Sequence, residues 1–278
     1  MTSSPALEDL GLLPLTHDVL TRAHAERVAR TLDLDDSLAD GTLPLTWIWA
    51  FFTPRAPTSA LRADGHPASS VGSPLAGLDR RMFVGGELER VGDVRLDRLT
   101  ERASAVLGAE PKQGGTGPFL IVDVEHHYRQ DDHDVLVERQ HLLYRTAPAQ
   151  AVSPPGAPTD RPPSAGLRNE IRPDERLLFR FSALTFNTHR IHYDLPYATG
   201  VEGYPGLVVH GPLIATALAQ LAEEQLRAPL SRFEFRAASP TFAGVNLVLV
   251  CDDVDAEGFL PVRAVREDGV TVMTGRAR

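Results

Sequence analysis

Residues 212–226, which read PLIATALAQLAEEQL, form the strongest helical pattern in the chain. Pro212 stands near the first turn, where a missing N–H costs nothing, and alanine and leucine fill the interior. The apolar residues lie nearly all round the helix, so it needs burial on most of its sides. Any fold of this chain must therefore enclose one central helix.

Strand patterns follow this helix at residues 231–237, 246–252, 260–267 and 270–276. The last two are joined by Asp268-Gly269, a dipeptide typical of tight hairpin turns. A buried helix followed by an antiparallel meander is the outline of a hot-dog domain, in which a sheet wraps around one helix. Upstream, residues 175–182 show the alternation of a strand, and residues 187–197 are expected to form a polar turn or short helix.

The first part of the chain is less regular. We expect an amphipathic helix within residues 18–32, a hairpin from residues 119–128 and 135–144, and a strand beginning near residues 81–86. Residues 146–173, TAPAQAVSPPGAPTDRPPSAGLRNEIRP, contain almost no large apolar side chains, which predicts an extended linker. The expected fold class is thus α+β, a double hot-dog with one domain over residues 1–145 and another over residues 174–278.

Composition excludes several classes of protein. The 278 residues include 28 lysine and arginine residues against 37 aspartate and glutamate residues, a net charge of -9, which argues against nucleic acid as a partner. Cys251 is the only cysteine, so an intrachain disulfide and a cysteine-based zinc site are excluded. The apolar run at residues 47–52 is far shorter than the roughly 20 residues of a membrane span, and no leader pattern is visible. We expect a cytoplasmic protein with no membrane partner.

The densest group of polar side chains lies at residues 181–200, FSALTFNTHRIHYDLPYATG, and VVHGP follows at residues 208–212, directly before the helix. A helix N-terminus presents unpaired N–H groups and a partial positive charge. The backbone N–H of Gly211 is therefore placed to bind a carbonyl oxygen and to stabilise negative charge that develops on it. Histidines such as His192 transfer protons near neutral pH, so the two segments together predict an acid–base site.

Two runs in this region, FSALTFNTHRIHYD at residues 181–194 and EGYPGLVVHGPL at residues 202–213, resemble the MaoC-like hydratases. The motif of that family, D-x-N-P-x-H, precedes a buried helix that begins after His-Gly. The resemblance is closer to the branch of type 2 hydroxyacyl-thioester dehydratases and mesaconyl-C4-CoA hydratases. It extends into the first part of the chain through Pro44, Trp47, Trp49, Asp64-Gly65-His66-Pro67, residues 80–86 and Tyr144-Arg145. It implies a double hot-dog hydro-lyase that acts on an acyl thioester, with mesaconyl-C4-CoA as one candidate substrate.

Matched position by position, His192 falls on the catalytic histidine of the family, but Asn187 stands where the motif has aspartate. Because asparagine cannot act as a base, the resemblance implies His192 as general acid/base, Asn187 orienting the water and the Gly211 N–H forming the oxyanion hole. Further residues are expected to contact the substrate, and these are His189, Arg190, Tyr193, Val209 and His210. Arg190 would pair with a phosphate of coenzyme A or a carboxylate of the substrate. The second domain would be catalytic, and the first a degenerate hot-dog that widens the acyl pocket.

Ordinary structural roles remain open for several of these residues. Asn187 suits a turn, His210 suits packing beside the helix start, and residues 64–67 are most simply a loop turn. The metal-binding residue types here are His189, His192, His210 and Asp194. Their spacing is not the i, i+4 pair of a helical zinc site, so no metal is expected. The chain has neither a G-x-G-x-x-G motif after a strand nor a P-loop, so no redox cofactor is expected.

Two other functions stay open at this point. A hot-dog acyl-CoA thioesterase would release free thiol, which a hydratase does not. A non-catalytic protein that binds acyl thioesters is also compatible with asparagine at position 187. The acyl group could be carried on coenzyme A or on an acyl carrier protein, and a homodimer is the expected assembly.

Overall fold

The computed structural model describes residues 12–34, 38, 40–68, 78, 80–114, 117–146 and 168–278. Within these residues, ten strands form one antiparallel sheet in the order β1-β3-β4-β5-β2-β7-β10-β9-β8-β6. The first half of the chain supplies β1 (Thr16–Val19), β2 (Arg80–Arg90), β3 (Leu99–Gly114), β4 (Gly117–Gln130) and β5 (His133–Arg145). The second half supplies β6 (Arg168–Ile171), β7 (Arg232–Ala237), β8 (Leu247–Cys251), β9 (Leu260–Arg266) and β10 (Thr271–Ala277).

The two halves meet in the middle of the sheet, where β2 pairs with β7. Glycines on β2 permit this close approach. A Cβ on Gly85 would lie 2.8 Å from the carbonyl oxygen of Phe235, and one on Gly86 would lie 2.6 Å from that of Arg139. Any side chain at these positions would force the neighbouring backbone away. The predicted double hot-dog fold is confirmed, and its two sheets are continuous across this pair of strands.

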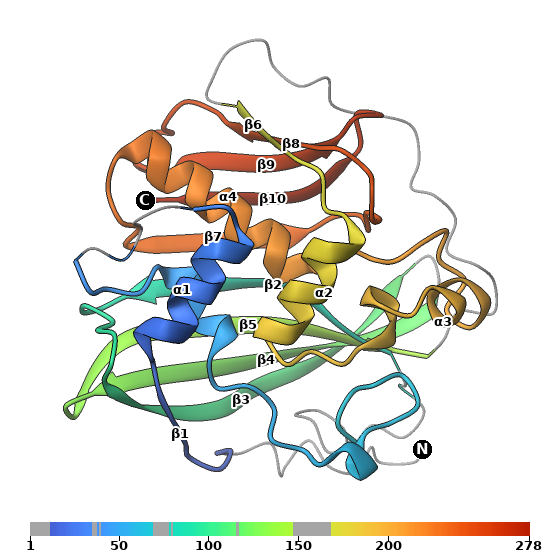
Figure 1. Cartoon of the computed structure of the whole chain (residues 1–278), viewed down its shortest axis with the longest axis horizontal. Helices are drawn as coiled ribbons and strands as arrows, with labels where there is room; N and C mark the ends of the chain where they lie inside the picture. The colour runs from blue at the N-terminus through green and yellow to red at the C-terminus, as the bar shows by residue number, and fades with distance from the viewer. Residues whose placement is uncertain are drawn as a thin grey trace.

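Helix α4 (Gly211–Leu226) is the central helix of the second half and lies in front of the sheet (Figure 1). Every residue from Leu213 to Ala222 is buried except Gln220, so the prediction of an enclosed helix is confirmed. The strands predicted after it are confirmed to within one residue at each end. Asp268 and Gly269 form the turn between β9 and β10, with Gly269 in the left-handed conformation at φ 83°.

The first half encloses a shorter helix. Helix α1 (Arg22–Thr31) lies within the predicted residues 18–32 and buries Ala25, Val28 and Ala29. The 3-10 segment η1 (Leu45–Ala50) carries the buried Trp47 and Ile48 against α4. A second 3-10 segment, η2 (Thr58–Ala60), lies in the long connection to β2. The predicted hairpin is confirmed as β4 and β5, and the strand expected near residues 81–86 is β2.

The strand predicted at residues 175–182 is wrong, because this segment forms helix α2 (Glu175–Leu184). Asp174 caps the helix by accepting a hydrogen bond from the N–H of Leu177 at 3.0 Å. The side chains of Leu178, Phe181 and Ser182 are buried at i, i+3 and i+4, which is the period of a helix. The alternation seen in the sequence was therefore coincidental, and the capping aspartate was the better signal.

Composition assigned residues 168–171 to a linker, but they form strand β6, which pairs with β8. Residues 147–167 of that segment lie outside the described part of the chain. Two further short helices, η3 (Arg190–His192) and α3 (Leu195–Gly200), stand where the polar turn or short helix was predicted. Among the described helices, none combines the length and apolar character needed to cross a membrane.

Candidate active site

A cavity of about 1430 Å³ is lined by both halves of the chain. The first half contributes residues 51–56, part of the loop that follows, and side chains of β2, β4 and β5. The second half contributes residues 185–189, His192, the start of α4 and residues 237–241. The polar cluster predicted from the sequence thus faces a cavity that residues of the first half also enclose.

His192 lines this cavity and has one side-chain nitrogen fixed by the backbone. Its Nδ1 lies 2.7 Å from the carbonyl oxygen of Val208, and because a carbonyl can only accept, Nδ1 carries the proton. The other ring nitrogen, Nε2, then holds a lone pair. Burial lowers the pKa of His192 to about 4, so the ring is neutral at neutral pH and can accept a proton.

His210 lies behind His192, at the N-cap position of α4. The two rings are stacked, with centroids 3.7 Å apart and planes 18° apart. Nε2 of His210 shares a hydrogen bond of 2.8 Å with the hydroxyl of Ser182. His210 is not among the described residues that line the cavity, so it packs against His192 at the helix start.

Gly211 is the first residue of α4 and lines the cavity. Its N–H makes no hydrogen bond to any acceptor in the described part of the chain. The N-terminus of this 16-residue helix therefore presents a free donor and a partial positive charge next to His192. A Cβ on Gly211 would lie 3.6 Å from the carbonyl oxygen of Phe83, which is an ordinary contact.

Asn187 lines the cavity, but its side-chain oxygen is already engaged. Oδ1 accepts a hydrogen bond from the N–H of His189 at 3.0 Å, and the Asn187 N–H donates to the carbonyl oxygen of Ser182 at 2.9 Å. These bonds form the turn that leads from α2 to η3. The side-chain nitrogen is the part of Asn187 left for a water molecule.

The residues expected to contact substrate divide into two groups. His189 and Val209 line the cavity, whereas Arg190 and Tyr193 are absent from its described lining. Arg190 donates to Asp194 at 2.7 and 2.9 Å and to the carbonyl oxygen of Ala63 at 3.0 Å. Its guanidinium also lies over the ring of Tyr197, 4.0 Å from the centroid. The structure therefore uses Arg190 to hold two segments of protein together.

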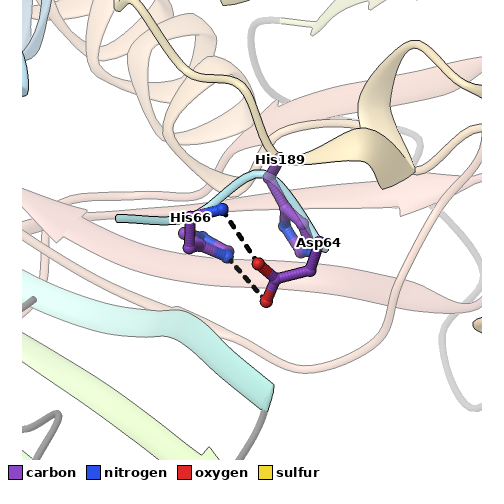
Figure 2. A group of neighbouring side chains, drawn as sticks. All are labelled: Asp64, His66 and His189. Atoms are coloured by element: carbon purple, nitrogen blue, oxygen red, sulfur yellow. Dashed lines mark hydrogen bonds and ion pairs between the residues drawn. The ribbon is translucent and has the colours of Figure 1, made fainter. Parts of the chain in front are cut away.

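A loop of the first half, residues 62–67, packs against His189, and its residues 64–67 were predicted only as a turn. Figure 2 shows Asp64 and His66 in contact, with the side chain of His189 reaching toward them. The rings of His66 and His189 have centroids 4.1 Å apart, and those of His189 and His192 are 5.4 Å apart. His66 lines the cavity. The contact between this loop and His189 could not be predicted from one sequence alone, because the two segments are more than a hundred residues apart in the chain.

Asp64, His66 and His189 are also the described residues that could hold a metal ion, since their ligand atoms all lie within 4.8 Å of one another. Arg62 already forms an ion pair with Asp64 at 2.5 Å. Burial lowers the pKa of His66 and of His189, and the positive charge of Arg81 lies close enough to lower both further. Two nearby cations oppose the binding of a third, so the donor set fits a metal ion poorly.

The chain is similar to known hydratases and dehydratases along most of its length. Residues 46–243 match the sequence model of the family hydroxyacyl-thioester dehydratase type 2. The chain is 39% identical to mesaconyl-C(4)-CoA hydratase of Chloroflexus aurantiacus over 245 residues, which cover 87% of each protein. It is 24% identical to the mitochondrial hydroxyacyl-thioester dehydratase type 2 of Saccharomyces cerevisiae over 260 residues, which cover 89% of each.

Solved structures share the fold at low sequence identity. A MaoC-like dehydratase matches with a TM-score of 0.71 and 15% identity, over 97% of this chain and 98% of that one. A conserved hypothetical protein of Mycobacterium tuberculosis, described as a double hot-dog, matches with a TM-score of 0.54 and 14% identity, over 95% and 94%. From its sequence and its fold, the chain belongs to the hydroxyacyl-thioester dehydratase type 2 family of acyl-thioester hydro-lyases.

Proposed function

We propose that this protein adds water across the C2–C3 double bond of an enoyl thioester, and reverses that reaction, with His192 as general acid/base. Support comes from one arrangement in the cavity wall. The carbonyl oxygen of Val208 fixes the proton of His192 on Nδ1, which leaves the basic Nε2 for substrate beside the N-terminus of α4. A neutral imidazole at this place can take a proton, and the helix terminus can bind the charge that the reaction creates.

In the hydration direction, hydroxide from water bonds to C3 while a proton leaves the water. The electron pair of the double bond moves toward the thioester oxygen and gives an enolate. The free N–H of Gly211 would donate to that oxygen, aided by the dipole of α4. Protonation of C2 completes the addition, and the amide of Asn187 would orient the water. Dehydration follows the same steps in reverse, so one site serves both directions.

We propose that the acyl group carries a free carboxylate, as in mesaconyl-C4-CoA, the substrate named for the relative that is 39% identical. Arg81 on β2 lines the cavity, and its Nε is buried without a hydrogen-bond partner among the described residues. A buried N–H without an acceptor is costly unless a ligand supplies the missing partner. A carboxylate matches the fork of an arginine side chain and would fill this place.

The neighbouring cavity arginine, Arg80, is a less suitable partner for that carboxylate. Its Nε is likewise buried without a partner among the described residues, but its guanidinium already forms an ion pair of 2.6 Å with Glu202 and a hydrogen bond of 3.2 Å to the carbonyl oxygen of the same residue. The charge of Arg81, in contrast, adds to burial in lowering the pKa of His66 and of His189. Arg81 therefore lies near the rings that we expect beside the reacting carbons. Arg81 is therefore the side chain that we assign to substrate choice.

We further propose a cytoplasmic, homodimeric enzyme that uses a coenzyme A thioester. A single buried cysteine, Cys251, is the usage expected in a reducing compartment. Sedimentation of the purified protein would test the dimer. Comparison of a coenzyme A thioester with the same acyl group on a carrier protein would test the choice of carrier.

Purified protein mixed with crotonyl-CoA or mesaconyl-C4-CoA tests the function through the absorbance of the conjugated thioester. We expect the absorbance to fall while a thiol reagent detects no free coenzyme A. His192→Ala should abolish the change, because removing a general acid/base costs roughly a hundred- to ten-thousand-fold. His133→Gln, at the exposed start of β5, is the matched control and should keep the activity. Thiol release would instead assign a thioesterase, and full activity of His192→Ala would refute the role of His192.

A further inference from the structure

The loop at residues 62–67 is fixed beside His189 by hydrogen bonds that its backbone accepts from the other half of the chain. The hydroxyl of Thr188 donates to the carbonyl oxygen of Gly65 at 2.5 Å, and the N–H of Arg190 donates to that of Asp64 at 2.9 Å. Gly65 has φ +93°, and a Cβ there would lie 1.8 Å from the carbonyl oxygen of Thr188. Only glycine permits this approach, so the position of the loop is built into the fold.

Asp64 and His66 form a carboxylate–imidazole pair on this loop. Oδ1 of Asp64 accepts from the backbone N–H of His66 at 2.9 Å, and Oδ2 lies 3.4 Å from Nδ1 of the ring. The two side chains are only 13% and 12% exposed. Burial acts to raise the pKa of Asp64, but hydrogen bonds from His66 and Arg62 outweigh it and hold that pKa well below its usual range. Asp64 is therefore ionised and directs the Nδ1 proton of His66, which leaves Nε2 as a base.

The imidazoles follow one another away from the start of α4. His210 precedes Gly211 and stacks on His192, His192 contacts His189, and His189 contacts His66. A thioester oxygen held by the Gly211 N–H would place C2 nearer to His192. C3 lies one bond further from that oxygen and would lie toward His66. His66 lines the same cavity and can meet a water molecule that attacks C3.

We propose that His66, positioned by Asp64, is a second catalytic residue of this site, which activates the water while His192 serves C2. This inference rests on the proposed hydratase function and adds a division of labour to it. In this arrangement Asp64, from the first half of the chain, supplies the carboxylate that Asn187 cannot provide. Asp64 touches His66 and not the reacting atoms, so it is a positioning residue.

The proton balance needs no external reagent. In hydration, Nε2 of His66 takes a proton from water as the C3–O bond forms and the electron pair of the double bond moves onto the thioester oxygen. The resulting imidazolium lies beside the carboxylate of Asp64, which stabilises it. The proton then passes by way of His189 or cavity water to His192, which delivers it to C2. Both histidines end neutral, as they began.

Isotope exchange at C2 separates the two roles. In deuterated water, the saturated analogue of the enoyl thioester that the wild type hydrates can exchange its C2 hydrogens, but it has no double bond to hydrate. We expect His66→Gln to lose hydration by roughly a hundred- to ten-thousand-fold and to keep this exchange. His192→Gln should lose both, and His133→Gln, the exposed control, should lose neither.

The same assays distinguish the ways in which this account can fail. Full hydration by His66→Gln would overturn the role of His66. Equal loss of hydration and exchange in that variant would also overturn the role of His66, because the side chain would then be needed for the chemistry at C2 as well as for activation of the water. A wild-type protein inactive in both assays would contradict the hydratase function itself.

Titration of the His66 ring, followed by NMR, tests the role of Asp64. The charged and titratable groups near the ring are Asp64 and Arg62 on its own loop, Arg81 on β2, and His189 and His192 from the second half. Burial lowers the pKa of His66, whereas Asp64 raises it. Asp64→Asn should therefore shift the titration to lower pH and slow hydration, while exchange at C2 continues. Asp253→Asn, on an exposed loop, is the control. An unchanged titration and rate in Asp64→Asn would refute the positioning role.

Discussion

At the scale of single residues, position 187 is where the site lacks the aspartate of the motif that it resembles. The amide of Asn187 accepts from the N–H of His189 and shapes the turn that presents His189 and His192. A carboxylate reaches the histidines from the other half of the chain, through Asp64 and His66. The loss of aspartate from the motif therefore need not remove acid–base chemistry from the cavity.

Arg81 should set the preference for a carboxylate-bearing substrate. Arg81→Gln should lower kcat/KM for mesaconyl-C4-CoA while changing that for crotonyl-CoA little, because only the former offers a carboxylate to the guanidinium. A hydrogen bond to a charged group contributes about 1.5–3 kcal/mol, which corresponds to a loss of roughly ten- to a hundredfold. Steady-state kinetics with both thioesters measure the ratio.

Arg81→Lys is the matched variant for this measurement, since it keeps the charge and loses the forked geometry. It should recover part of the preference for mesaconyl-C4-CoA. Equal losses with both thioesters in Arg81→Gln would contradict the assignment and would give Arg81 a role in the shape of the cavity.

At the scale of elements, the N-terminus of α4 is the part of the fold on which enolate stabilisation depends. Gly211→Pro removes the N–H but suits the first position of a helix. His210 before it has ψ 128°, which is compatible with a following proline. Gly211→Ala keeps the N–H, and its Cβ would meet the carbonyl oxygen of Phe83 at an ordinary 3.6 Å.

We expect Gly211→Pro to reduce kcat by roughly a hundred- to a thousandfold, the usual effect of removing one oxyanion donor. Gly211→Ala should lose far less, and thermal unfolding should report similar stabilities for the two variants. Equal losses of kcat in the two variants would contradict the oxyanion role. Both substitutions fill space at position 211, but only proline removes the N–H.

Most elements could be predicted because their patterns are local. The buried helix and the strands after it follow from residues within one window of sequence, and so does the hairpin of β4 and β5. Helix α2 was missed because a short apolar run fits both periods, and only the cap at Asp174 separates them. His192 and Gly211 could likewise be chosen as candidates from one continuous pattern at the start of α4.

At the scale of the whole molecule, the features that sequence could not supply are contacts between distant segments. Thr188 and Gly65 are 123 positions apart, yet their hydrogen bond fixes the loop that carries Asp64 and His66. The continuity of the sheet depends on the pairing of β2 with β7, which no local period encodes. The first half, expected only to widen the pocket, thus also brings titratable side chains and Arg81 to the cavity.

A single turnover in water labelled with heavy oxygen and deuterium tests most directly whether this molecule is a hydro-lyase that uses His192. Mass spectrometry of the product should find the heavy oxygen in the acyl chain of an intact thioester, with one deuterium at C2. His192→Ala should yield neither label in the same time. Heavy oxygen in the carboxylate of a released acid would contradict the account, and so would an unlabelled substrate recovered from the wild-type protein.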